Sequence, residues 1–339
     1  MKAILYRQYG GPKVLRLEEI AKPVPSDNEV LIRIRAASVN PYDWHFLRGT
    51  PHLIRLMTGL RRPRSPRLGA DAAGIVEAVD RNVQSFKPGD EVFGTCKGSF
   101  AEYACAAEAN LAKKPENVTF EQAASAGIAG LTALQGLRDK GRLQPCQRVL
   151  INGAAGGVGT FAVQIAKVLG AEVTGVCSAR NVEMVRSIGA DHVVDYTRED
   201  FTRSSRRYDL ILDCIGNHPL RACIRILNAK GAYVGVGGPS DAWSILAGTI
   251  GKPVLSLFAS QRFIGFIAHI SRADLEFLGE LMKTGRLSPV IARRYPLEQV
   301  PEAIRYVEQG RTRGKVTIAV KSEMAKTDLR ALTPDPCEL

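Results

Sequence analysis

A glycine-rich segment is the clearest candidate for chemistry in this chain of 339 residues. Residues 149–159 read VLINGAAGGVG, so an apolar run leads into closely spaced glycines, and an amphipathic stretch follows at 160–169. Small residues at a strand-to-helix turn let the backbone approach a pyrophosphate, and the helix N-terminus offers free N–H groups and a positive dipole end. Because strand and helix signals flank the glycines, the segment predicts a dinucleotide-binding loop. The alternative is a glycine-rich structural turn.

The residues after the next apolar run indicate which dinucleotide binds. The strand predicted at 172–177 ends about 20 residues beyond the loop, where NAD-binding proteins carry an acid for the ribose 2′-hydroxyl. Here Ser178 and Arg180 follow the strand instead. A guanidinium makes charge-assisted hydrogen bonds to a phosphate, so this pair favours the 2′-phosphate of NADPH. The alternative for Arg180 is a solvated position at the start of the next helix.

The elements that must position these residues fall into two kinds. The first third of the chain has short strand-like runs separated by Gly- and Pro-rich turns, which predicts a β-rich, barrel-like domain. These runs lie at 1–6, 14–19, 30–37, 72–79, 91–94 and 100–106. After helical stretches at 120–128 and 130–140, strands and helices alternate from 148 to 236. Such alternation predicts an α/β domain with a doubly wound parallel sheet.

The end of the chain returns to mixed elements. Ser271 and Asp274 predict the start of a capped helix, a second helix is predicted at 297–309 before Gly310, and a last strand at 315–320. The tail 321–339 has two prolines and little periodicity, so we expect it to be poorly ordered. The expected division is 1–123 for the β-rich domain, 124–270 for the nucleotide-binding domain and 271–320 for a return to the first domain.

Composition narrows the class of protein. The hydrophobic fraction of 45% and the charged fraction of 24% are typical of a globular protein, and the formal net charge is +12. Seven cysteines are scattered singly, which is not the pattern of a disulfide framework or a cysteine-rich zinc site. The N-terminal residues MKAILYRQYG lack the apolar core of a secretory signal. We therefore expect a cytoplasmic protein with reduced thiols.

Several further motifs, together with the glycine loop and the Ser178–Arg180 strand end, carry a family resemblance. They are ASVNP at 37–41, LGADAAG at 68–74, KPGDEV at 87–92, GLTA at 130–133 and RGKV at 313–316. In this combination the chain resembles the medium-chain dehydrogenase/reductase superfamily over residues 1–320. Within it, the chain is similar to the zinc-independent quinone oxidoreductases, most closely to the reticulon-4-interacting-protein-like branch.

The resemblance implies a GroES-like catalytic domain built from both ends of the chain, a central Rossmann domain and an active-site cleft between them. It assigns the pyrophosphate to Ala155, Gly156, Gly157 and Val158. It further assigns the adenosine phosphate to Ser178, Arg180 and Tyr196, and it places the nicotinamide near the ends of later strands, at 214–216 and at Gly237. Tyr196 has the alternative of simple packing at a strand end. The superfamily also implies a homodimer.

The same resemblance predicts that the active site holds no zinc. Zinc-dependent relatives have a catalytic cysteine where this chain has Asn40, and a His-Glu pair where it has Ala70 and Asp71. They also have a lobe with four cysteines, and in that region this chain has only Cys96 and Cys105. Too few ligands remain for either kind of zinc site. Without a Lewis acid, hydride transfer needs an acceptor that delocalises charge itself, such as a quinone or an α,β-unsaturated carbonyl.

Three polar residues are the catalytic candidates. The Asn40 amide is expected to donate to a substrate oxygen or to hold the ribose, Asp43 to orient neighbouring donors, and His45 to supply a proton. Each has a structural alternative: Asn40 precedes Pro41 and fits a turn, and Asp43 and His45 fit ordinary packing or solvent-facing positions.

Two other segments depart from the family pattern. The first is the loop 49–68, which is rich in leucine. Between Asp43 and Asp71 the chain has six arginines and no acidic residue. These are Arg48, Arg55, Arg61, Arg62, Arg64 and Arg67. A lid over the cleft, a patch that attracts NADPH, a peripheral contact with an anionic membrane and a solvated loop all remain open. The apolar stretch 242–270 is interrupted by charges and proline, so it predicts core packing, a subunit interface or an apolar substrate wall rather than a membrane span.

The sequence therefore predicts an NADPH-dependent, zinc-free reductase of a small apolar quinone or conjugated carbonyl. The alternatives are an enoyl-thioester reductase of the same fold and a dinucleotide-binding regulatory protein with little turnover. A zinc alcohol dehydrogenase is a more distant alternative. Nucleic acid is not an expected partner, because the basic residues lack interleaved aromatics and no helix-turn-helix pattern is present.

Overall fold

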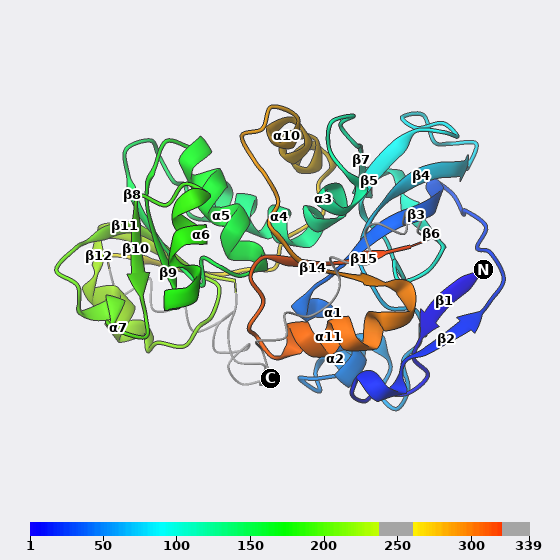
Figure 1. Ribbon diagram of the computed structural model, residues 1–339, viewed down its shortest axis with the longest axis horizontal. Coiled ribbons are helices and arrows are strands. Elements are labelled where there is room, and N and C mark those ends of the chain that lie inside the picture. Colours follow the sequence, from blue (N-terminus) through cyan, green and yellow to red (C-terminus); the bar gives the residue numbers. More distant parts are fainter. Residues whose placement is uncertain (237–259, 321–339) are drawn as a thin grey trace.

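Two β-sheets, one parallel and one mostly antiparallel, organise the computed structural model, which describes residues 1–236 and 260–320 (Figure 1). The parallel sheet has six strands in the order β10-β9-β8-β11-β12-β13. Its strands are β8 (Arg148–Asn152), β9 (Glu172–Cys177), β10 (His192–Asp195), β11 (Tyr208–Asp213), β12 (Leu227–Gly235) and β13 (Arg262–Gly265). Every pair in this sheet is parallel. The predicted doubly wound sheet is confirmed.

This strand order fixes where a ligand binds. The chain starts at β8 in the middle of the sheet, moves outward to β10, and then returns to place β11 on the other side of β8. The connecting helices are α5 (Gly157–Val168), α6 (Val182–Ser187) and α7 (Leu220–Arg225). The loops after β8 and β11 therefore diverge to opposite faces, and they open a crevice at the carboxyl ends of the strands.

The second sheet joins the two ends of the chain. Of its seven strands, six follow the order β14-β15-β3-β4-β5-β7, and the seventh, β6, pairs with β3 off this path. The strands are β3 (Glu29–Val39), β4 (Asp71–Val79), β5 (Glu91–Thr95), β6 (Tyr103–Ala107), β7 (Leu111–Lys113), β14 (Ile291–Pro296) and β15 (Lys315–Ala319). A separate hairpin pairs β1 (Lys2–Leu5) with β2 (Arg16–Glu19). The β-rich unit thus contains C-terminal strands, as the resemblance implies.

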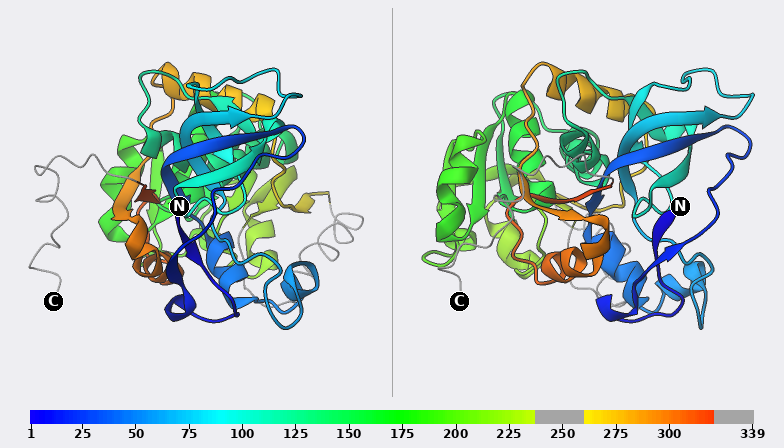
Figure 2. Two further views of the ribbon diagram at one scale, coloured as in Figure 1. Left: turned by 90° about the vertical axis from the view of Figure 1, so that its right-hand side faces the viewer. Right: turned by 45° about the vertical axis from the view of Figure 1, so that its right-hand side comes forward.

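Helices connect the two sheets and cover them (Figures 1 and 2). The α-helices outside the parallel sheet are α1 (Pro41–Arg48), α2 (Ile54–Thr58), α3 (Phe120–Ser125), α4 (Gly127–Leu134), α10 (Arg272–Lys283) and α11 (Val300–Glu308). A π-helical turn, Gln135–Lys140, follows α4. Short 3-10 helices span Pro12–Val14, Glu108–Asn110, Ala179–Asn181, Phe201–Arg203 and Leu297–Gln299. One apolar core joins α3, α4, α5 and α10 to the parallel sheet, and a second fills the β-rich unit.

Most predicted strands are present within a residue or two, but two helices were missed. Helices α1 and α2 lie where the sequence analysis placed a turn and a loop. Helix α1 escaped notice because Pro41 and a mixed polar face hide its periodicity, although Asn40 and Asp43 form a capping box at its start. The predicted tail 321–339, Gly237 and most of the apolar stretch 242–270 lie outside the described residues. Within the described ranges, none of the helices has the length and apolarity needed to cross a bilayer.

Candidate active site

Two glycines shape the turn between β8 and α5. Gly153 has a φ of +83°, and a Cβ added there would lie 2.8 Å from the Ile215 side chain. A Cβ added at Gly159 would lie 2.1 Å from the carbonyl oxygen of Gly153. A side chain at Gly159 would clash with the backbone, and one at Gly153 would have to adopt a left-handed conformation that L-residues rarely take. These two glycines are therefore required by the tight turn and by the close approach of helix α5 to the strand.

Gly156 and Gly157, which lie between them, are less crowded by the backbone. An added Cβ at Gly156 would come within 4 Å only of a backbone oxygen at 3.4 Å, and at Gly157 the nearest atom is Lys315 Cδ at 3.2 Å. Helix α5 begins here with Gly156 at the N-cap, and no side chain caps the first-turn N–H groups. Free donors, a positive helix end and room above the backbone fit a pyrophosphate. Ala155 and Val158 flank this opening in the sequence.

A buried carboxylate ties this loop to the loop after β11. The Asn152 side chain donates a hydrogen bond of 2.9 Å to Asp213 Oδ1, which also accepts from the backbone N–H groups of Ile215 and Gly216. The Tyr233 hydroxyl donates to Asp213 Oδ2 at 2.6 Å. Asp213 is only 1% exposed, so these bonds have little competition from water. The two loops at the crevice of the parallel sheet are thus held at a fixed separation.

Two arginines, Arg311 and Arg313, lie beside Arg180 just after the end of β9. The Arg180 guanidinium donates to the carbonyl oxygen of Arg311 at 3.3 Å, and the Arg313 guanidinium donates to the carbonyl oxygen of Arg180 at 3.0 Å. All three residues are exposed, and among the described residues none of them has a carboxylate within ion-pair distance. Like charges gathered without counter-ions form a site for an anion. The sequence analysis found Arg180 but missed Arg311 and Arg313, because they lie 131 and 133 residues away.

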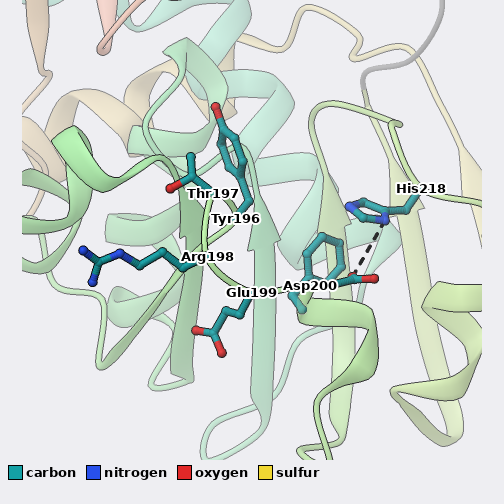
Figure 3. A pocket seen from close by; sticks show the side chains of 7 residues that line it. Tyr196, Thr197, Arg198, Glu199, Asp200 and His218 are labelled. Atoms are coloured by element: carbon teal, nitrogen blue, oxygen red, sulfur yellow. Dashed lines mark ion pairs between the residues drawn. The ribbon is translucent and has the colours of Figure 1, made fainter.

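Tyr196 lines a hollow of about 330 Å³ beside the same strand ends (Figure 3). Its backbone N–H donates to the carbonyl oxygen of Cys177, the last residue of β9, so it lies next to Ser178. The Tyr196 side chain is 58% exposed. Its ring is therefore available to a ligand and does not pack into the core. Across the hollow, the His218 ring packs edge-on against Phe201.

A buried polar cluster occupies the junction of the two sheets. Asp71 Oδ2 accepts hydrogen bonds of 2.8 Å from the Ser38 hydroxyl and from the Asn40 amide. Asp71 Oδ1 accepts from the backbone N–H of Ile128, in the first turn of α4, at 2.8 Å. The Lys315 ammonium donates to Asn40 Oδ1 at 2.6 Å and lies 3.6 Å from Asp71 Oδ2. All four side chains are at most 3% exposed.

Strand register assembles this cluster. Ser38 pairs with Asp71 between β3 and β4, and Val39 pairs with Val316 between β3 and β15. The next residues along β3 and β15, Asn40 and Lys315, therefore face each other at the end of the sheet. The sequence analysis treated Lys315 as part of a closing motif and did not identify it as a site residue.

The start of β15 also contacts the nucleotide-binding loop. The Gly314 N–H donates to the carbonyl oxygen of Ala155 at 2.8 Å, and the Lys315 stem lies beneath Gly157. Lys315 thus spans the distance from the pyrophosphate loop to Asn40. Burial lowers the pKa of Lys315, and the Asp71 and Asp43 charges oppose that effect. The cluster places a lysine ammonium between the two sheets at the cofactor end of the crevice.

The structure brings Asn40 and Asp43 together. Asp43 Oδ2 accepts the backbone N–H of Asn40 at 2.7 Å, which completes the capping box of α1. The Asn40 amide oxygen is bonded to Lys315 and its nitrogen to Asp71, so both of its polar ends have protein partners. The amide nitrogen also lies 3.5 Å from the carbonyl oxygen of Ser38, so donation to a substrate would replace one of these contacts, and it stays a prediction.

His45 lies apart from these two residues. Its Nδ1 is 2.9 Å from the carbonyl oxygen of Thr50, and its ring stacks on Trp44. Among the described residues, no hydrogen bond or ring contact connects it with Asn40 or Asp43. Burial lowers its pKa, which favours the neutral imidazole. Its role as a proton source stays a prediction.

Asp43 is expected to make stability depend on pH. The side chain is fully buried, and burial, with a smaller contribution from the Asp71 charge, raises its pKa to about 7, whereas an unfolded Asp titrates near about 3.9. Between these two pKa values, Asp43 is protonated in the native state and ionised in the unfolded state. The unfolding free energy therefore falls as pH rises through this window. Asp43→Asn keeps an acceptor for the cap and removes the titration. Urea unfolding of both proteins across this window measures the effect, and parallel profiles would contradict it.

No metal centre is visible among residues 1–236 and 260–320, where no three His, Cys, Asp or Glu side chains are placed to share an ion. At the positions that the resemblance compares with zinc ligands, Asn40 and Asp71 are bonded to each other and Ala70 has no ligand atom. Gly237, expected near the nicotinamide, lies outside the described residues.

Comparisons with known proteins agree with this architecture. Residues 26–116 match the family model described as an alcohol dehydrogenase GroES-like domain, and residues 188–318 match one described as a zinc-binding dehydrogenase. A chloroplast envelope quinone oxidoreductase homolog of Arabidopsis thaliana is 32% identical and covers 94% of this chain and 98% of its own. The mitochondrial NAD(P)H oxidoreductase RTN4IP1 of Bos taurus is 34% identical, over 94% of this chain and 89% of its own.

Solved structures are similar along nearly the whole chain. The quinone oxidoreductase of Coxiella burnetii has a TM-score of 0.83 at 32% identity and covers 95% of this chain and 99% of its own. The Escherichia coli quinone oxidoreductase complexed with NADPH has a TM-score of 0.79 at 26% identity, with 94% and 100% covered. CurK enoyl reductase has a TM-score of 0.82 at 25% identity, with 94% and 99% covered. The chain therefore belongs to the quinone oxidoreductase family of the medium-chain dehydrogenase/reductase superfamily and is a nicotinamide-dependent oxidoreductase.

Proposed function

We propose that this protein is an NADPH-dependent, zinc-independent reductase that transfers a hydride to a quinone or an α,β-unsaturated carbonyl. The observation that carries the choice of NADPH is the convergence of Arg180, Arg311 and Arg313 at the end of β9. A 2′-phosphate supplies the negative charge that these guanidinium groups lack, whereas the diol of NADH does not. The E. coli relative complexed with NADPH supports the same choice.

The chain's own residues bind and orient the reactants. The first turn of α5 holds the pyrophosphate, and the arginines hold the adenosine phosphate. When bound, the reduced nicotinamide supplies the hydride. Lys315 and Asp71 fix the Asn40 amide at the other end, where it holds the ribose or donates to the substrate oxygen. A conjugated acceptor spreads the incoming charge, so the polarising metal of a zinc dehydrogenase is not required.

Turnover with a panel of acceptors tests this proposal. Oxidation of NADPH and NADH is followed with a benzoquinone, a naphthoquinone, a conjugated enone and a saturated ketone, on protein analysed for metals and treated with a chelator. We expect turnover of the conjugated acceptors with NADPH, no reduction of the saturated ketone and no effect of chelation. Loss of activity on chelation, restored by Zn²⁺, would overturn the zinc-independent assignment. Binding of NADPH without oxidation by any acceptor would favour a regulatory protein.

An enoyl-thioester reductase is the second candidate, and the similarity to CurK enoyl reductase supports it. A thioester substrate carries a long phosphorylated arm, which the exposed arginines after α2 would suit. Comparison of kcat/KM for a crotonyl thioester and for a quinone separates the two. A higher value for the thioester would favour the second candidate.

A homodimer is the assembly we propose. Strand β13 lies at the edge of the parallel sheet, and Ile267, just beyond it, is 92% exposed. Among the described residues no strand pairs with the outer edge of β13, and such an edge next to an exposed apolar side chain suits pairing with a second copy. Sedimentation of the wild type and of Ile264→Pro, which interrupts β13, tests this, and a monomeric wild type would contradict it.

A further inference from the structure

Three leucines on and beside helix α2 are largely exposed. Leu53, Leu56 and Leu60 are 51%, 59% and 67% exposed. Leu53 is the N-cap of α2 and Leu56 lies within it, whereas Leu60 follows the turn at Gly59, so the three leucines belong to one short stretch of the chain. Figure 2 shows the segment at the periphery of the molecule. Grouped exposed leucines, unlike isolated ones, mark a contact surface.

The segment is held firmly in this exposed position. The Tyr9 hydroxyl is 2.7 Å from the Thr58 hydroxyl and donates to the carbonyl oxygen of Gly59 at 2.6 Å. The N–H of Arg64 donates to the carbonyl oxygen of Thr58 at 2.7 Å, which closes the turn after the helix. Gly59 has a φ of +120°, and an added Cβ would clash with the backbone there. The fold thus presents the leucines on an anchored turn.

Only part of the arginine series is available at this surface. Arg48 is bound to Glu308, and Arg55 donates to the carbonyl oxygen of Gly49 while it covers the Tyr9 ring. Arg61 and Arg62 are exposed beside Leu60, and within the described part of the chain no carboxylate pairs with them. The stretch from 44 to 70 contains no acidic residue. We call the leucines together with Arg61 and Arg62 the α2 patch.

We propose that the α2 patch docks on the surface of an anionic lipid bilayer. Proteins that bind at a membrane surface combine exposed apolar side chains with basic ones. The apolar side chains enter the boundary of the acyl chains, and the cations stay among the anionic headgroups. A nucleic acid would pair with the arginines but leave the leucines in water. The patch begins at Leu53, shortly after α1, the helix that Asn40 caps.

Binding to vesicles tests the proposal with the full-length protein. Sedimentation is measured with phosphatidylcholine vesicles and with vesicles that also contain phosphatidylglycerol, at low and high salt. The variants are Leu53→Ser/Leu56→Ser/Leu60→Ser and Arg61→Glu/Arg62→Glu. The matched control is Arg81→Glu/Lys87→Glu, which makes the same change in net charge at exposed positions after β4. Circular dichroism and turnover of a water-soluble quinone report that each variant is folded.

We expect the wild type to bind only the anionic vesicles and to be released by salt. Each α2-patch variant should reduce the bound fraction by at least about tenfold, whereas the control should retain it. Absence of wild-type binding at low salt, or an equal loss in the control, would overturn the proposal. If the leucine variant binds the vesicles as well as the wild type does, only the arginine charges hold the protein to the anionic surface. That result would also overturn the proposal. Conversion of a wild-type oligomer into a monomer by the leucine variant would assign the patch to a second copy instead. Turnover of the soluble quinone tests the proposed function separately.

Discussion

Replacing Arg180 and Arg313 by alanine is expected to weaken NADPH binding by about 10- to 100-fold and to leave NADH binding almost unchanged. A charge-assisted hydrogen bond to phosphate contributes about 1.5–3 kcal/mol, and the lower end applies here because both side chains are exposed. The effect arises because the guanidinium groups face a phosphate that NADH lacks. Titration of both coenzymes by fluorescence measures it.

Arg180→Ala alone is expected to weaken NADPH binding about tenfold, and adding Arg313→Ala should weaken it further. Arg221→Ala is the matched control, because Arg221 is an exposed arginine of the same domain on α7 with no ion-pair partner among the described residues. Raising the salt concentration should reduce the difference between the coenzymes. Equal losses for NADPH and NADH in the double variant would overturn the assignment of this end of the crevice to the 2′-phosphate.

Lys315→Met is expected to lower the unfolding free energy by about 3–5 kcal/mol and to reduce turnover sharply. Removing one partner of a buried ion pair leaves the other charge uncompensated, and Asp71 is completely buried. The Asn40 amide oxygen would also lose its donor, so the amide could rotate away from its present orientation. Urea unfolding measures the first effect, and NADPH oxidation with a quinone measures the second.

A second buried lysine provides the control. The Lys114 side chain is 4% exposed, but its ammonium donates to the carbonyl oxygens of Pro115 and Val118, and its acidic partner Glu91 is 44% exposed. Lys114→Met leaves no buried carboxylate unpaired, so it should cost less stability and leave turnover intact. Lys315→Met/Asp71→Asn should recover most of the stability but not the activity. A Lys315→Met protein as stable as the wild type would contradict the buried ion pair.

Local sequence was sufficient to predict those features that a single short segment of the chain forms. The glycine loop was predictable because the strand, the turn and the helix adjoin in the chain, and the turn itself requires Gly153 and Gly159. Ser178 and Arg180 were found because the spacing from the loop is fixed by one strand and one helix. Asn40 and Asp43 also have the spacing of a capping box for α1. The helix was not predicted, because its sequence shows no clear apolar periodicity.

Contacts between distant segments could not be derived in the same way. Asn40 and Lys315 are 275 residues apart, and nothing in either motif specifies that β15 pairs with β3. Once that register is formed, Lys315 must face Asn40, and the preceding loop brings Arg311 and Arg313 to Arg180. The same applies to the arginine-rich loop, where only the folded chain shows that Arg48 and Arg55 are engaged and Arg61 and Arg62 are not.

The amino-acid sequence by itself determined the family, the two kinds of domain and the glycine-rich turn between β8 and α5, because these depend on residues that are neighbours along the chain. Tertiary structure alone decided which charges gather at each end of the crevice. The physical reason is that a sheet register, set by burial of alternate side chains over whole strands, fixes side chains from opposite ends of the chain within hydrogen-bond distance. The arginine cluster after β9 and the buried Lys315–Asp71 pair both arise in this way.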